Sequence, residues 1–276
     1  MKKFLSACLV VLFMFSISTS ALGATSEEKP KGCTFTKSKD AKVLFKKEPT
    51  SNIDDLYKMA IEKKGFLKDD ELKKFSKKEA YLESKEKGKN AKVDKVKLNI
   101  ASTSELIEVY EDNGEKHEVF SVTEFALVSN KDLAETDSDY GVLGSETDYG
   151  EKWDSSISVK AYSTNYYNRS SADGANSCID LSSVTGGWTR SDSSVSIGTK
   201  TVNYGQTGTR CDYIGSVTQK SGNKYPSSNS YSYAVLSSWV PVTIEPTSTV
   251  VGQSSTAELT RNSSKWTLSL TNHVTN

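Results

Sequence analysis

Two stretches in the first half of the chain repeat apolar residues at the spacing of a helix. Between residues 53 and 61 the apolar positions follow an i, i+3, i+4, i+7, i+8 pattern, which predicts one buried helical face. Ser51 or Asn52 can cap the start of this helix, because both side chains accept hydrogen bonds from backbone N–H groups. A second helix is predicted to begin at Asp69, with Leu72 facing inward.

The apolar period then changes to two. Residues 106–110 and 117–122 alternate between apolar and polar and flank Asn113-Gly114. This pair favours a two-residue hairpin turn, because both of its positions take positive φ. The second strand of the hairpin is predicted to continue through residues 125–128. Helices followed by a hairpin predict a small α+β region in the first half of the chain.

Only strands are predicted in the second half. Residues 157–161, 195–199 and 231–236 form candidate strands, and two alternating runs, 257–261 and 266–270, predict a hairpin. Short strands separated by Gly, Ser and Asn are typical of an antiparallel β-sandwich. No helical pattern interrupts them, which argues against a parallel βαβ architecture.

Composition divides the chain further. Residues 25–135 are rich in lysine, residues 136–152 form an acidic linker that contains glycine, and all four tryptophans lie in residues 153–276. We therefore expect an α+β N-terminal region followed by an all-β antiparallel sandwich domain that folds by itself. The charged run 73–92 is interpreted as a solvated face and linker, with a membrane-surface helix as the alternative.

The carboxylates of the acidic linker could gather around a calcium ion. An EF-hand needs glycine at its sixth position and glutamate at its twelfth, and counting from Asp137 these places hold Val142 and Asp148. A flexible hinge fits the glycines, small polar residues and like charges better, although an irregular calcium site stays open. Proteases cut exposed segments of this kind, so residues 25–135 could be a pro-region and the secreted product could begin near Glu151.

The first residues predict export. Residues 1–24 combine a basic start, a short apolar run and small residues, which is the pattern of a secretory signal peptide cleaved after Gly23 or Ala24. We therefore expect a secreted, extracellular protein. No later stretch reaches the ~18 apolar residues that a membrane-spanning helix needs.

Three cysteines follow the signal peptide, and export makes a disulfide possible. The favoured pair is Cys178–Cys211, and closing that loop stabilises a fold by about 3–4 kcal/mol in the chain-entropy model. Cys33 could pair elsewhere, stay free or leave with a removed segment.

Catalytic and metal-binding motifs are poorly represented. The two histidines, His117 and His273, lie in a predicted strand and near the C-terminus, and neither is favoured as a catalytic base. Gly252-Gln253-Ser254-Ser255-Thr256 lacks the final glycine of a hydrolase nucleophile elbow. Zinc and phosphate-loop patterns are missing, so we expect no catalytic residues, metal or cofactor. Paired carboxylates of a glycoside hydrolase stay open, because they need not be close in sequence.

Aromatic residues supply the candidate contact site. Trp188 follows Gly186-Gly187 and is interpreted either as a core aromatic after a turn or as an exposed ring that stacks on sugars or meets a membrane. Tyr162, Tyr166 and Tyr167 offer the same choice. Trp188, Tyr166 and Tyr167 are the expected target-contact residues.

Two stretches support a family resemblance. "SSVTGGWTRSDSSVSIGTKTVNYGQTG" (182–208) and "SSTAELTRNSSKWTLSLTN" (254–272) resemble segments of exported Gram-positive proteins, some of which are similar to geobacillin-type large bacteriocins. The resemblance covers at most residues 153–276 and implies a secreted antibacterial protein that is not obviously an enzyme.

The expected function combines export with this resemblance. We expect a bacteriocin-like protein whose partner is the envelope or membrane of competing bacteria. The alternative is a cell-wall or carbohydrate-binding module without toxicity, and a hydrolase of unfamiliar type comes third. The formal net charge of zero argues against nucleic acid as a partner, and the oligomeric state stays open.

Overall fold

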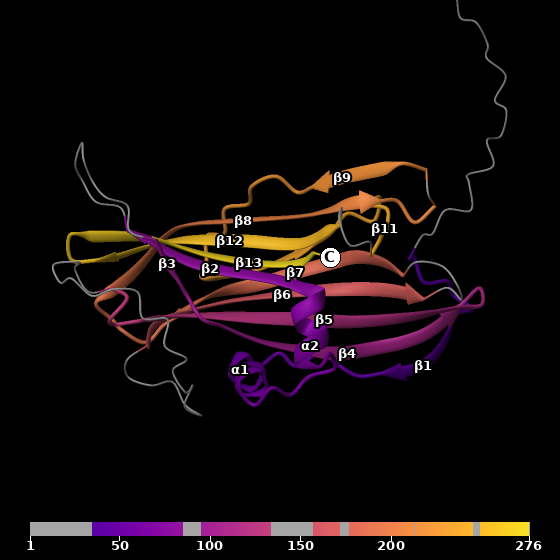
Figure 1. Ribbon diagram of the computed structural model, residues 1–276, viewed down its shortest axis with the longest axis horizontal. Coiled ribbons are helices and arrows are strands. Elements are labelled where there is room, and N and C mark those ends of the chain that lie inside the picture. Colours follow the sequence, from indigo (N-terminus) through magenta and orange to yellow (C-terminus); the bar gives the residue numbers. More distant parts are fainter. Residues whose placement is uncertain are drawn as a thin grey trace, which may run out of the picture. The chain divides into compact units, whose positions relative to one another are not determined.

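Two antiparallel β-sheets face one another in the computed structural model (Figure 1). The structure describes residues 35–84, 95–133, 157–171, 177–212, 214–244 and 249–275. Sheet A contains, in spatial order, β1 (Lys42–Lys46), β4 (Ile100–Asp112), β5 (Glu115–Ser129), β6 (Ile157–Ser171), β7 (Cys178–Arg190) and β10 (Ser230–Ala234), and β11 (Val242–Thr243) also pairs with β7. Sheet B contains β3 (Lys95–Lys97), β2 (Ser76–Ser84), β13 (Ser264–Thr275), β12 (Val250–Arg261), β8 (Val195–Thr209) and β9 (Ser216–Lys220). The predicted mostly β, antiparallel architecture is confirmed.

Strands from both predicted regions share both sheets. β5, which precedes the acidic linker, pairs with β6, which follows it, from Lys116 opposite Ser171 to Ser129 opposite Ile157. β2 pairs with β13 at the end of the chain. Gly32–Asn276 accordingly forms one compact unit. The structure therefore does not divide into an N-terminal region and a separate sandwich domain at 153–276 as expected, because composition does not reveal pairing between distant strands.

Part of the charged run 73–92 is a strand. In β2 the small and apolar side chains of Ala80 and Leu82 are buried, while Lys77 is exposed. Charged outward positions hide this alternation in the sequence, so the expectation of a solvated linker is wrong for residues 76–84. Residues 85–94, the acidic linker at 136–152, Cys33 and the signal peptide at 1–24 lie outside the described residues.

The two predicted helices are present. In α1 (Ile53–Ile61) the Asn52 side chain caps the start by accepting from the backbone N–H groups of Asp54 and Asp55. α1 packs against the outer face of sheet A over β4 and β5 (Figure 1), where the Tyr57 ring lies 5.3 Å from Phe125. α2 (Asp69–Phe75) leads into β2, and its buried Leu72 joins the core between the sheets.

Buried amide side chains connect the two sheets. This amide belt consists of Asn165, Gln206, Gln253 and Asn272, all 0% exposed. Asn165 of β6 donates to the carbonyl oxygen of Asn272 at 2.8 Å, and Asn272 of β13 donates to two sheet A carbonyls at 3.1 and 3.2 Å. Gln253 of β12 donates to two more at 2.9 and 3.1 Å, and Gln206 of β8 accepts from the backbone N–H of Leu181 at 2.9 Å.

A disulfide joins the sheets at one end. Cys178, the first residue of β7, bonds to Cys211, which follows β8, as the sequence predicted. β11 lies beside it, pairing with β7 and meeting Arg210 through an isolated bridge. This edge of the sandwich is therefore closed by covalent and backbone bonds together.

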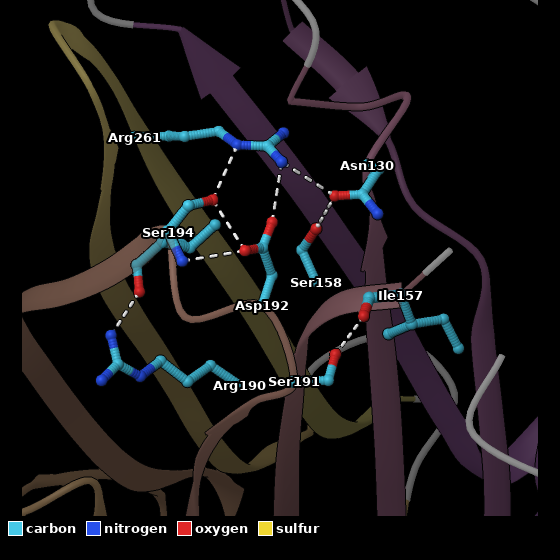
Figure 2. Close-up of polar contacts among 9 residues, drawn as sticks. Asn130, Ile157, Ser158, Arg190, Ser191, Asp192, Ser194 and Arg261 are labelled. Atoms are coloured by element: carbon cyan, nitrogen blue, oxygen red, sulfur yellow. Dashed lines mark hydrogen bonds and ion pairs between the residues drawn. The ribbon is translucent and has the colours of Figure 1, made fainter. Parts of the chain in front are cut away.

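The chain crosses from sheet A to sheet B between β7 and β8. Polar side chains at this crossing form a second connection between the sheets, in addition to the disulfide (Figure 2). Arg261 of β12 forms an ion pair with Asp192 at 2.7 Å and donates to the Asn130 side chain at 3.2 Å. Asp192 also accepts from the backbone N–H and hydroxyl of Ser194, which holds the pKa of its carboxyl below the usual range. The drawn side chains satisfy one another, so we interpret the cluster as structural.

The sandwich core also holds a buried carboxyl group. Glu124 of β5 is 0% exposed and accepts a hydrogen bond of 2.7 Å from the Ser76 hydroxyl of β2. Its second oxygen has no hydrogen-bond partner among the described residues. Burial raises the pKa of Glu124 to about 8 from its ordinary value of 4.5, so the folded protein holds this carboxyl protonated at neutral pH.

The shared sheets predict the outcome of cleavage between residues 134 and 156. A chain cut there by a site-specific protease should stay together as one species in size-exclusion chromatography, because β5–β6 and β2–β13 pairing hold the two pieces. Denaturant should separate them, since both cysteines of the disulfide lie after the cut. Residues 151–276 expressed alone should lack a cooperative unfolding transition. A stable isolated fragment would contradict this prediction.

Glu124 predicts a stability that depends on pH. As pH rises from 4.5 toward 8 the unfolded chain loses this proton while the folded chain keeps it, so stability falls with rising pH. Relative to Glu124→Gln, the unmodified protein should lose about 3 kcal/mol of unfolding free energy between pH 4.5 and 7 in urea titrations. Glu111→Gln, at an exposed position, should show no such difference. If the unfolding free energies of the protein and of Glu124→Gln change in parallel with pH, Glu124 does not hold a raised pKa.

Candidate contact surface

Alternation along β6 places its tyrosines on opposite faces of sheet A. Tyr167 is 0% exposed and points into the sandwich, where its hydroxyl accepts from Asn165 at 2.7 Å. Tyr162 packs beside α1 on the outer face and is half-buried. Tyr166 lies four residues further along the strand, so it shares that outer face, and it is also half-buried. Of the predicted contact residues on β6, only Tyr166 is therefore accessible.

Trp188 belongs to the core. It is 2% exposed, and its ring lies 5.6 Å from that of Tyr231. The interpretation of Trp188 as a core aromatic therefore agrees with the structure, whereas Trp188 and Tyr167 are both wrong as surface contacts, because the partner sheet covers them. The expected turn at Gly186-Gly187 is also wrong, since both glycines lie inside β7.

The outer tyrosines belong to a grid of nine residues on β6, β7 and β10. The strand register aligns these residues in three rows. We call this grid the tyrosine face: Tyr162, Gly187 and Ser230; Thr164, Thr185 and Ser232; Tyr166, Ser183 and Ala234. None of the nine carries a charge, although a quarter of the whole chain is charged.

A glycine positions the first ring. A Cβ atom on Gly187 would stand 2.7 Å from the Tyr162 hydroxyl oxygen and 3.0 Å from its Cζ, so the ring lies across β7 at this residue. Aromatic rings commonly cover glycines of a neighbouring strand in this way. Gly186 makes the matching space for Tyr231 on the inner face. Gly186 and Gly187 thus leave room for one tyrosine ring on each face of β7.

The second ring is held by a hydroxyl group. Burial raises the pKa of Tyr166 above its usual value, and a hydrogen bond from the Thr185 side chain partly opposes this shift. Burial also raises the pKa of Tyr162. Both phenols therefore stay neutral at physiological pH and can donate as well as accept hydrogen bonds. Ser230 and Ser232 add exposed hydroxyl groups to the same surface.

The two histidines offer little for chemistry at the surface, because His117 is buried and His273 is half-buried. His117 stacks on Tyr110 with ring centroids 4.7 Å apart, and burial lowers its pKa. Burial also lowers the pKa of His273 to about 4, so both rings are neutral at pH 7. In the part of the chain that the structure describes, no group of three or more His, Cys, Asp or Glu side chains is placed to hold a metal ion. No helix of that part is long and apolar enough to cross a membrane.

Comparisons with protein-family models, with curated proteins and with solved structures gave no match to this chain.

Sequence reasoning identified the tyrosines but not the small residues beside them. Thr185, Ser183 and Ser232 carry no individual signal, since serine and threonine are frequent throughout the second half of the chain. Only the pairing of β7 with β6 and β10 brings them next to the rings.

Proposed function

We propose that this protein is a secreted, bacteriocin-like antagonist that acts at the envelope of competing bacteria, and that the tyrosine face is its contact surface. The observation that carries the proposal is the pair of outward rings, Tyr162 and Tyr166, on one strand within a grid of nine uncharged residues. Tyrosine suits contact surfaces because its ring offers apolar area and its hydroxyl a polar end. The signal-peptide pattern and the sequence resemblance supply the expected compartment and target.

A second surface supports action at the membrane. Edge strand β1 exposes three successive apolar residues, Val43, Leu44 and Phe45, at 46%, 46% and 42%, between Lys42 and Lys46. Exposed apolar side chains can enter the interfacial region of a bilayer while the flanking lysines keep their ammonium groups in water. In this proposal the tyrosine face first holds the protein on the cell, and β1 then meets the membrane.

The alternative function is a wall-binding or carbohydrate-binding module without toxicity. The uncharged, hydroxyl-rich tyrosine face favours it as much as it favours an antagonist. The two functions differ in the effect on the cell once the protein has attached, so growth inhibition by the purified full chain separates them.

Attachment is predicted to depend on the two outward rings. Purified full chain should sediment with intact Gram-positive cells, and the double variant Tyr162→Ala/Tyr166→Ala should bind at least about tenfold more weakly, because it loses two stacking contacts. Tyr225→Ala is the matched control, since Tyr225 is 69% exposed and lies outside the tyrosine face. Equal binding by all three proteins would contradict the assignment of the tyrosine face as the surface that binds cells.

Inhibition is predicted to depend on β1 in addition. Phe45→Ser should raise the concentration needed to stop growth at least about tenfold, because burying a phenylalanine side chain contributes about 1.5–3 kcal/mol. Its binding to cells should stay unchanged, and Leu236→Ser, at a residue that is 68% exposed elsewhere, should behave like the unmodified protein. Cell binding without inhibition of any related strain would leave the non-toxic module as the function.

A further inference from the structure

The chemistry of the tyrosine face restricts the class of ligand. Its rings and hydroxyl groups offer stacking and hydrogen bonds but no cation to meet a phosphate or carboxylate. The outer side of sheet B differs, because Lys77, Glu79 and Glu83 alternate outward along β2. An uncharged ligand with both apolar faces and many hydroxyl groups fits the tyrosine face best, and sugar rings have these properties.

The distance between the two tyrosine rings sets a minimum length for the ligand. Tyr162 and Tyr166 are four residues apart on one face of β6, so their Cα atoms are separated by about 13 Å. One sugar ring is too short to touch both tyrosines. Thr164 and Thr185 fill the row between them, and Thr164 is 3% exposed and bonds to Thr123 at 2.9 Å. Thr185 is half-buried and Ser232 is exposed, and the Thr185 hydroxyl that donates to Tyr166 can still accept a hydrogen bond.

We propose that the tyrosine face binds a neutral polysaccharide strand laid along β6, with sugar rings stacked on Tyr162 and Tyr166 and hydroxyl groups bonded to Thr185 and Ser232. This inference rests on the proposed function and names its ligand. The bound polysaccharide should run along β6, because both tyrosine rings project from that one β-strand. A chain of several β-linked units lies flat enough to meet both rings at once, so affinity should grow with chain length.

The test uses oligomers of N-acetylglucosamine from one to six units as soluble probes in isothermal titration calorimetry with the full chain. The hexamer should bind at least about tenfold more tightly than the dimer, because only the longer chain reaches both rings. Tyr162→Ala/Tyr166→Ala should lower the affinity for the hexamer at least about tenfold, whereas Tyr225→Ala should leave it unchanged.

Loss of the Tyr162 ring uncovers Gly187 and could disturb β7, so a second variant is needed. Ser232→Glu changes an exposed position on β10 that faces solvent, and it should weaken hexamer binding by placing a charge beside the sugars. The urea midpoint of each variant shows whether its fold is intact. Tyr162→Phe/Tyr166→Phe keeps both rings and should retain most of the affinity.

The outcomes separate this inference from the proposed function. Absence of hexamer binding, or equal affinity for the dimer and the hexamer, overturns the polysaccharide assignment. If the protein still sediments with cells and the double tyrosine variant does not, the proposed function stands with a different ligand. If the protein binds neither cells nor oligosaccharides, both proposals fail.

Discussion

Buried amide groups that must find hydrogen-bond partners determine how the two sheets meet. Leaving one such group unsatisfied costs about 1–3 kcal/mol, so the register of the sheets is fixed wherever amides of one sheet reach carbonyls of the other. The Asn165 amide donates to the backbone carbonyl of Asn272 in sheet B, and the Asn272 amide donates to the backbone carbonyl of Ser163 in sheet A. Gly252 gives this pair room, since a Cβ there would stand 2.9 Å from the Asn165 amide nitrogen, and its φ of +148° disfavours other residues.

This constraint leaves the outer faces of the sheets for the proposed contact surface. The interior of the sandwich is filled by the amide belt, Glu124 and packed aromatics, and the side-chain oxygens of Asn165 and Asn272 have no hydrogen-bond partner among the described residues. The outer face of sheet A is divided in two. α1 covers β4 and β5, its Asp54 pairs with the buried Lys160 of β6 at 2.9 Å, and the tyrosine face beyond is partly accessible, with Thr164 and Gly187 buried. The helix therefore sets one border of the tyrosine face.

Sharing of strands between the two halves of the chain has a functional consequence. A pro-region that contributes β2, β4 and β5 cannot leave without exposing the edge of β6 and half of the core. Cutting the acidic linker would therefore produce a two-piece protein rather than a released domain. Any change in activity on cleavage would have to come from the linker itself or from local rearrangement.

Local signals in the sequence determined much of the fold: the helix at 53–61, the hairpin at Asn113-Gly114, most strands of the second half and the Cys178–Cys211 bond. These features depend on period, turn chemistry and residue type, which neighbouring residues supply. The sequence analysis expected Tyr166 and Tyr167 both to contact the target, but strand alternation places adjacent residues on opposite faces of β6.

Only the tertiary structure decided which of the two tyrosines faces inward. Both faces of β6 carry mixed polar and aromatic residues, so alternation alone does not assign them. The pairing of β2 with β13 and of β5 with β6 depends on contacts between residues far apart in the chain, which no local pattern records. The opposing sheet hides Tyr167 and Trp188, and the same packing leaves Tyr162 and Tyr166 at the surface.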